Sequence, residues 1–216
     1  MPELKIKDQY LIKNEAQLRE QFGDTTDSIW AKATNSISEP MRKFIELSPY
    51  CCISSSDNQG QTDISPRGDA PGFIEVANPG QLLIPDRPGN RRYDTIRNIF
   101  QNPQVSLLFM IPGVPITVRV NGTAQISCDP ELLGQFVVRN KQPKMVVIVS
   151  VQEAYGQCAK AILRGKLWKS DFKLSSADVP TLAELMTYHL KIKEEEFVRI
   201  DGTIQQDLKD LSLIHI

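Results

Sequence analysis

The chain has 216 residues, 41% of them hydrophobic, and its 25 basic and 26 acidic residues leave a formal net charge of −1. This length and composition favour one domain with a sizeable core. The near-neutral charge excludes the broad basic surface that nucleic acids or anionic membranes attract. No apolar run approaches the roughly 20 residues of a membrane span, and no signal-peptide core follows Met1, so we expect a cytoplasmic protein that binds neither nucleic acid nor membrane.

The first 48 residues are predicted to form a helical layer packed on the rest of the protein. The helix candidates are residues 13–23, 27–37 and 39–47. The third carries an apolar stripe of Met41, Phe44 and Ile45, which suits one buried face. We expect this layer to share a single domain with a central unit at residues 49–168 and a C-terminal helix and tail at residues 169–216.

The middle of the chain alternates strand patterns with turns rich in Pro, Gly and Asn. The strand candidates are residues 49–56, 61–67, 73–76, 81–84, 105–111, 116–127 and 144–151. Helices are expected at residues 93–102, 129–133 and 156–167 and after a capping-box pattern at Thr181. Six or seven short strands with helices at their ends predict a mainly β, α+β fold, more barrel than sandwich, because short strands need their edges closed or covered.

Two strand candidates have polar faces. In residues 61–67 the period of two places Asp63, Ser65 and Arg67 on one face, which suits a ligand site. In residues 116–127 the even positions are apolar, whereas the odd positions are uncharged polar residues and one arginine. A strand exposed to solvent would usually carry more Lys and Glu, so the second polar face indicates a subunit interface or a ligand wall.

Residues 84–98 join a strand end, a turn and a helix start, and they are locally basic. They contain Arg87, Arg91, Arg92 and Arg97 against Asp86 and Asp94. A helix N-terminus offers unpaired N–H groups, and guanidinium groups beside it suit a phosphate. Two interpretations remain open: a site for a phosphate-bearing ligand, or arginines that only pair with the aspartates and cap the helix.

The sequence supplies few groups for metal binding or proton transfer. Its cysteines are Cys51, Cys52, Cys128 and Cys158, and the two histidines lie far from them in sequence. We therefore expect no metal site, and reduced thiols buried in the core. No Ser-His-Asp order, GxGxxG or GxxxxGK[ST] motif is present, so we name no catalytic residue and favour an organic cofactor that carries the chemistry itself.

Four sequence blocks resemble one known family. They are SPRGD at 65–69, IPDRPGNRRYDT at 84–95, NPQVSLLF at 102–109 and RVNGTA at 119–124. In order and spacing they resemble the flavin-binding proteins related to pyridoxamine 5′-phosphate oxidase, and the resemblance covers residues 44–168. It implies an FMN-binding split β-barrel and a homodimer with one FMN at each of two sites across the subunit interface.

The resemblance also implies roles for individual residues. The phosphate and ribityl chain of FMN would be held by Ser65, Arg67, Asp86, Arg87, Asn90, Arg91 and Thr95. The backbone at Ile84 and Pro85 would run along the isoalloxazine ring. Thr117 and Arg119 match positions that reach the flavin of the other subunit, and Lys160, Arg164 and Trp168 lie where the family closes the flavin pocket.

The function implied by the resemblance is an FMN-dependent oxidoreductase that passes hydride between an unknown small substrate and flavin N5. The alternative is a non-catalytic protein that binds flavin, or haem, as a carrier or sensor on the same barrel. Nothing after Leu167 matches the C-terminal substrate clamp of true pyridoxamine-phosphate oxidases. The resemblance therefore does not extend to the oxidation of vitamin B6.

Overall fold

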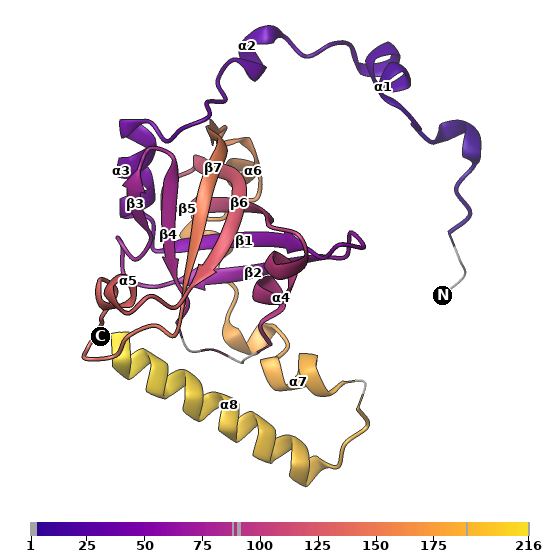
Figure 1. Ribbon diagram of the computed structural model, residues 1–216. Helices are drawn as coiled ribbons and strands as arrows, with labels where there is room; N and C mark the ends of the chain where they lie inside the picture. The colour runs from indigo at the N-terminus through magenta and orange to yellow at the C-terminus, as the bar shows by residue number, and fades with distance from the viewer. Residues whose placement is uncertain (1–3, 88, 90–91, 189, 216) are drawn as a thin grey trace.

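The computed structural model describes residues 4–87, 89, 92–188 and 190–215, and its centre is one antiparallel sheet that curls on itself (Figure 1). The strands are β1 (Tyr50–Ser56), β2 (Thr62–Gly68), β3 (Glu75–Asn78), β4 (Gln81–Pro85), β5 (Gln104–Met110), β6 (Thr117–Ser127) and β7 (Val146–Gln157). Their order in the sheet is β2-β1-β5-β6-β7-β4-β3, and every neighbouring pair is antiparallel. The predicted class, mainly β with peripheral helices, is confirmed.

The core lies where the apolar faces of neighbouring strands meet. Phe109, Leu107 and Val120 are at most 1% exposed. In the register of the sheet, Phe109 lies between Cys51 of β1 and Val118 of β6, and all three side chains belong to the same buried cluster. Burial of this apolar surface is the main force that holds the curled sheet together.

The strand β6 follows the predicted alternation. Val118, Val120 and Ala124 are buried in the core, whereas Arg119 and Asn121 are half-buried on the opposite face. The two faces therefore differ as the sequence indicates, with an apolar inner side and a polar outer side.

The strand β7 is longer than its apolar run predicts. It continues to Gln157, so the helix expected at residues 156–167 is reduced to α6 (Lys160–Arg164). The cause lies in the partner strand, because Gln157 is opposite Thr117, the first residue of β6. Backbone pairing with a long neighbour thus extends β7 beyond the residues that favour a strand by themselves.

The N-terminal segment packs on the barrel through α3 (Glu39–Leu47), where Ile45 is 1% exposed and Met41 and Phe44 pack on the core cluster. The helices α1 (Glu15–Phe22) and α2 (Asp27–Trp30) bury no residue, and α2 is much shorter than residues 27–37. Figure 1 shows both helices in an arm that extends away from the sheet, preceded by a 3₁₀ turn at Asp8–Tyr10. The apolar stripe of α3 has no counterpart on α1 or α2, so only α3 joins the core.

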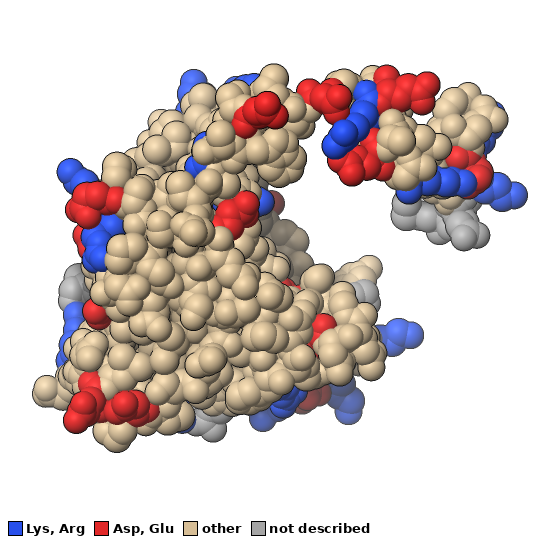
Figure 2. All heavy atoms as spheres, turned by 45° about the horizontal axis from the view of Figure 1, so that its top comes forward, with Lys and Arg blue, Asp and Glu red and all other residues tan. Residues whose placement is uncertain are grey.

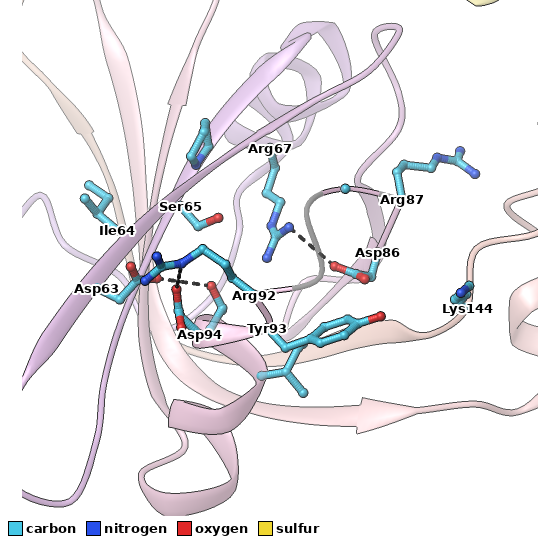
Figure 3. A pocket seen from close by; sticks show the side chains of 14 residues that line it. Asp63, Ile64, Ser65, Arg67, Asp86, Arg87, Arg92, Tyr93, Asp94 and Lys144 are labelled. Atoms are coloured by element: carbon cyan, nitrogen blue, oxygen red, sulfur yellow. Dashed lines mark hydrogen bonds and ion pairs between the residues drawn. The ribbon is translucent and has the colours of Figure 1, made fainter. Parts of the chain in front are cut away.

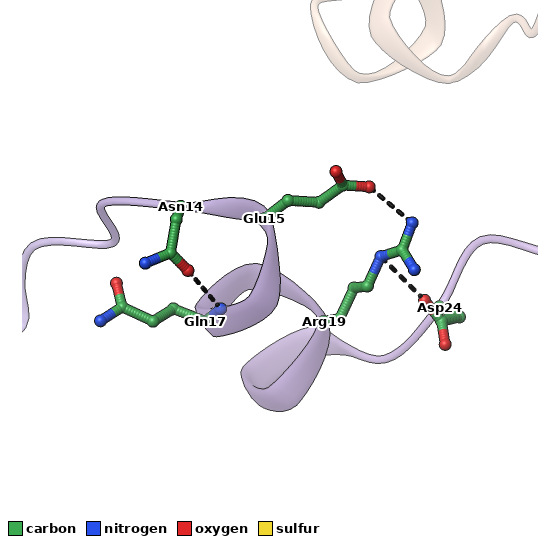
Figure 4. A network of polar contacts seen from close by, with 5 residues as sticks. All are labelled: Asn14, Glu15, Gln17, Arg19 and Asp24. Atoms are coloured by element: carbon green, nitrogen blue, oxygen red, sulfur yellow. Dashed lines mark hydrogen bonds and ion pairs between the residues drawn. The ribbon is translucent and has the colours of Figure 1, made fainter.

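Local contacts define α1 even though it buries none of its residues. The side chain of Asn14 accepts a hydrogen bond from the Gln17 N–H at 3.0 Å, and Arg19 forms ion pairs with Glu15 and Asp24 (Figure 4). Figure 2 shows the arm standing clear of the body, with acidic and basic side chains mixed on its surface. Exposed pairs of this kind contribute about 0–1 kcal/mol each, so they specify the helix more than they stabilise it.

The remaining helices lie at the ends of the barrel and beyond it. α4 (Asp94–Gln101) packs against β1, β2 and β6, and α5 (Pro130–Gly134) follows β6. Two 3₁₀ turns, Ser170–Phe172 and Ser176–Asp178, lead to α7 (Leu182–Thr187), which begins with the predicted capping box of Thr181 and Glu184. The last helix, α8 (Glu194–His215), follows where the sequence analysis expected a tail, and it packs against α7. Among the described residues, none of the helices combines the length and the apolar character that crossing a membrane requires.

The expectation that all four thiols lie in the core is wrong for two of them. Cys51 is fully buried and Cys52 is half-buried, but Cys128 and Cys158 are exposed. Cys128 and Cys158 directly follow the last residues of β6 and β7, where the chain leaves the sheet. Burial raises the pKa of Cys51 well above its ordinary value, so that thiol stays protonated.

Candidate functional site

A cavity of about 330 Å³ lies where β2, the end of β4 and the start of α4 come together (Figure 3). It is lined by Asp63, Ile64, Ser65, Pro66, Arg67, Asp86, Arg87, Gly89, Arg92, Tyr93, Asp94, Thr95, Ile96 and Lys144. Four of these residues are basic and three are acidic, so the lining is strongly polar. Among the described residues, no group of three His, Cys, Asp or Glu side chains could hold a metal ion.

The alternation of side chains along a β-strand explains which residues of β2 line the cavity. Asp63, Ser65 and Arg67 are each half-buried, whereas Ile64 and Pro66 between them are exposed. Figure 3 shows the guanidinium group of Arg67 directed into the space opposite Asp86. The polar face that the sequence indicates for this strand thus lies along the cavity.

Two arginines of the basic stretch, Arg87 and Arg92, are paired with carboxylates. Arg92 Nε donates to Asp94 Oδ2 at 2.7 Å, which agrees with the interpretation that the arginines pair with aspartates. Arg87 Nε donates to Asp69 Oδ2 at 2.8 Å, and Arg87 Nη1 donates to the Phe136 carbonyl at 2.7 Å. Arg87 therefore extends away from Arg67 at the cavity rim (Figure 3). Pairing does not exclude anion binding, because a guanidinium group has five N–H donors.

Arg67 forms an ion pair with Asp86 across the cavity, with 3.3 Å between Arg67 Nη1 and Asp86 Oδ1. β2 and β4 are not neighbours in the sheet, since four strands separate them in the strand order. The pair therefore connects two distant parts of the sheet and shows that the sheet curls enough to close one end of the barrel.

The N-terminus of α4 forms the third wall. Tyr93, at the N-cap position, has a left-handed backbone with φ 57° and makes no side-chain cap hydrogen bond. Thr95 is 2% exposed, and its hydroxyl donates to Asp63 Oδ2 at 3.5 Å, which joins the helix start to β2. The first residues of α4 thus line the cavity, and a helix start offers unpaired backbone N–H groups and the positive end of the helix dipole to an anion.

Asp86 has a perturbed pKa and gives a testable pH dependence. Burial raises the pKa of Asp86 above its ordinary value of 3.8, and the nearby charge of Arg67 offsets only part of this effect. Because the folded state then holds this proton more tightly than the unfolded chain, the contribution of Asp86 to stability is fully present below pH 3.8 and is lost as the pH rises through the raised pKa.

Urea unfolding of the wild type and of Asp86→Asn should reveal this linkage. Between about pH 4 and about pH 7, we expect the stability of the variant relative to the wild type to increase with pH, since asparagine does not ionise. A stability difference that stays constant over this range would contradict the assignment.

Several predicted cofactor residues lie at the edge of the cavity or outside the described chain. Ile84 is 1% exposed in the core, so only its backbone could contact a ligand. Pro85 lines a smaller neighbouring cavity of about 190 Å³, which it shares with Arg67 and Arg87. Asn90 and Arg91 lie outside the residues that the structure describes.

Thr117 and Arg119 lie on the other face of the sheet from the cavity. Arg67 of β2 is opposite Cys51 of β1 in the sheet. Cys51 is in turn opposite Phe109 of β5, and Phe109 is opposite Val118 of β6. Arg67 therefore shares the inner face of the sheet with Val118. Arg119 points to the outer face by the period of two, and its Nη1 donates to the Tyr155 hydroxyl at 2.9 Å. Thr117 Oγ1 donates to Gln157 Oε1 at 3.5 Å on the same face. Within one chain, these two residues do not line the cavity.

Lys160, Arg164 and Trp168 are also separate from the cavity within one chain. The first two belong to α6, and Trp168 follows it. The indole Nε1 of Trp168 donates to the Val114 carbonyl at 2.9 Å, so the ring fixes the segment after α6 against the β5–β6 connection. None of the three is among the residues that line the cavity.

The structure adds cavity residues that the sequence analysis did not select. Asp63 was on the polar face of its strand, and Arg92 and Asp94 were in the basic stretch, so the sequence contained a signal for each. Lys144 had no such signal. It reaches the cavity because β7 pairs with β4, which places the residues before Val146 beside the end of β4.

Together these features define a class: a curled antiparallel barrel with an arginine-lined cavity at a helix N-terminus, suited to a phosphate-bearing ligand. The family model for pyridoxamine 5′-phosphate oxidase matches residues 37–164, more than half of the chain. The chain belongs to this family, and its fold is the split β-barrel of flavin-binding proteins of this type. None of the curated proteins matches the sequence significantly.

Solved structures with a similar architecture come from several bacteria. HupZ of Group A Streptococcus is 19% identical and has a TM-score of 0.46, and the similarity covers 56% of this chain and 93% of that chain. General stress protein 26 of Bacillus anthracis is 19% identical with a TM-score of 0.40, over 53% and 88% of the two chains. The FAD binding protein of Mycobacterium smegmatis is 17% identical with a TM-score of 0.40, over 57% and 97%.

Proposed function

We propose that this protein binds FMN in the cavity between β2, β4 and α4, and that it is an FMN-dependent oxidoreductase acting on a small substrate. The observation that carries the proposal is the convergence of Ser65, Arg67 and the α4 N-terminus on one cavity, in a chain of the pyridoxamine 5′-phosphate oxidase family. Guanidinium donors and helix N–H groups together match the geometry and charge of a phosphate group.

Different residues around the cavity would bind different parts of FMN. Arg67 and the first turn of α4 would bind the phosphate, and Ser65 with the hydroxyl of Thr95 would bind the ribityl chain or the phosphate edge. The backbone around Ile84 and Pro85 would border the ring. When bound, FMN supplies the redox chemistry, a hydride transfer at N5, which explains why a chain with only two histidines needs no acid–base pair of its own.

A homodimer would complete the proposed site. Thr117 and Arg119 cannot serve the cavity of their own chain because they lie on the outer face of the sheet, so they are proposed to reach the flavin of a second subunit. A cationic Arg119 near the pyrimidine side of the ring would stabilise the reduced, anionic flavin. Lys160, Arg164 and Trp168 are proposed to close the same composite pocket.

The first test is the visible spectrum of the purified protein, followed by titration with FMN. We expect the absorption of oxidised flavin and saturable binding. A Soret band would instead support haem binding, and a colourless protein that takes up no FMN would contradict the proposal. NADH, NADPH or reduced deazaflavin is then added anaerobically and bleaching of the bound flavin is followed. Failure of every donor to bleach the flavin at full occupancy would count against an oxidoreductase.

A further inference from the structure

An ion pair between Arg67 and Asp86 occupies the part of the cavity where a phosphate would bind. Arg67 and Asp86 are both mostly buried, with side chains 23% and 13% exposed, and both line the cavity. A carboxylate is thus already in contact with the guanidinium group that is best placed to bind an anion. Any anionic ligand that uses Arg67 competes with this internal partner.

Asp86 is held in place by its backbone. Its N–H donates to the Met145 carbonyl at 2.9 Å, at the point where β4 and β7 run side by side. The next residue, Arg87, is fixed to Asp69 and to the Phe136 carbonyl. The backbone of Asp86 is therefore held in place, whereas its side chain can exchange Arg67 for another partner.

The charged and titratable groups around Asp86 come from three elements of the cavity. They are Asp63 and Arg67 from β2, Arg92, Tyr93 and Asp94 from the turn and the start of α4, and Lys144 from the segment before β7, with Arg87 next in the chain and directed to Asp69. Figure 3 shows Asp86 between Arg67 and Lys144. If Arg67 turned to a phosphate, Asp86 would face that phosphate, with Lys144 as the cation on its other side.

We propose that Asp86 is an internal counter-ion that Arg67 exchanges for the phosphate of the ligand, and that this exchange makes phosphate binding take up a proton. The inference rests on the proposed FMN site and deepens it. A ligand carboxylate would only replace Asp86 with a group of the same charge, whereas a phosphomonoester brings up to two negative charges and three acceptor oxygens. The cavity is thus suited to a phosphomonoester, and a ligand without an anion gains nothing from Arg67.

The sign of the proton linkage follows from the contacts. In the free protein Arg67 stabilises the carboxylate form of Asp86, and in the bound state that charge is taken by the phosphate, which also repels the carboxylate. Binding therefore raises the affinity of Asp86 for a proton. As a consequence, proton uptake by Asp86 favours binding as the pH is lowered, whereas protonation of the phosphate itself, near its second pKa of about 6, opposes binding.

The test uses Asp86→Asn, which removes the competing charge and keeps the shape. FMN, riboflavin and inorganic phosphate are titrated into the wild type and the variant by calorimetry in two buffers of different ionisation enthalpy. We expect the variant to bind FMN and phosphate about tenfold more tightly, to bind riboflavin unchanged, and to lose part of the proton uptake that accompanies FMN binding.

Asp57→Asn is the matched control, because Asp57 lies in the β1–β2 turn outside the cavity lining and its replacement leaves the Arg67–Asp86 pair intact. It should show no tighter binding and no loss of proton uptake. If the wild type binds FMN but Asp86→Asn binds it with unchanged or weaker affinity and unchanged proton uptake, the exchange is wrong. If the wild type binds neither FMN nor phosphate, the proposed cofactor site itself fails.

Discussion

Replacing Arg67 with alanine is expected to weaken FMN binding by roughly 10- to 150-fold, which corresponds to the loss of about 1.5–3 kcal/mol for hydrogen bonds to a charged group. Arg67 is the cation of β2 that points into the cavity, where it forms an ion pair with Asp86. The dissociation constant for FMN is measured by quenching of flavin fluorescence, and riboflavin serves as the ligand without phosphate. The affinity of the protein for riboflavin should change little.

Two companion variants make this test specific. Arg67→Lys retains the charge but loses the planar fork, so we expect a smaller loss of FMN affinity than in Arg67→Ala. Arg97→Ala removes an exposed arginine of α4 that is not among the cavity residues, and FMN affinity should stay at the wild-type value. An Arg67→Ala protein that unfolds more easily yet binds FMN normally would show that Arg67 only closes the barrel.

Replacing Gly122 with alanine is expected to destabilise the barrel by about 3 kcal/mol or more, since overpacking against backbone has little room to relax. A Cβ at Gly122 would lie 2.1 Å from the Ser150 carbonyl oxygen and 3.3 Å from Val149 Cγ1. The residue also sits at the β-bulge between Asn121 and Gly122, where the register of β6 against β7 shifts. An added methyl group would therefore push apart the two longest strands of the sheet.

Thermal unfolding followed by circular dichroism measures the effect, and a fall in Tm of roughly 6–12 °C is expected for a chain of this size. Gly156→Ala is the control from the same strand pair, because Gly156 is opposite Val118 and a Cβ there meets no atom within 4 Å. Its Tm should change by much less than that of Gly122→Ala. Equal effects of the two substitutions would show that β propensity, not the close contact with Ser150, governs the response.

Most of the sheet could be predicted because each strand carries its own signal. In β6, for instance, apolar residues such as Val118 and Val120 alternate with polar residues such as Arg119 over the length of the strand, and this pattern determines which face is buried. Where the signal ended, the prediction failed. The extension of β7 to Gln157 depends on pairing with β6, and pairing between distant segments cannot be predicted from the sequence of either segment alone.

The helices show the same difference between features with a local sequence signal and features that depend on distant contacts. The stripe on α3 predicts a buried helix, and Ile45 is in the core. The capping box of Thr181 and Glu184 marks the start of α7, because those two residues bond to each other's backbone and need no distant partner. The short extent of α2 was not predicted, because the segment after the helix makes a contact with a distant part of the chain: Thr34 exchanges backbone hydrogen bonds with Ala154 of β7.

The sequence by itself determined the class of the fold, the polar face of β2, the basic stretch before α4 and the resemblance to a family of flavin-binding barrels. Those features are local, and strand alternation, turn residues and helix starts encode them within a few positions. Tertiary structure alone decided that Arg67 meets Asp86 and that Lys144 joins them. It did so because curling of the sheet brings β2 to the end of β4, although four strands separate the two in the strand order.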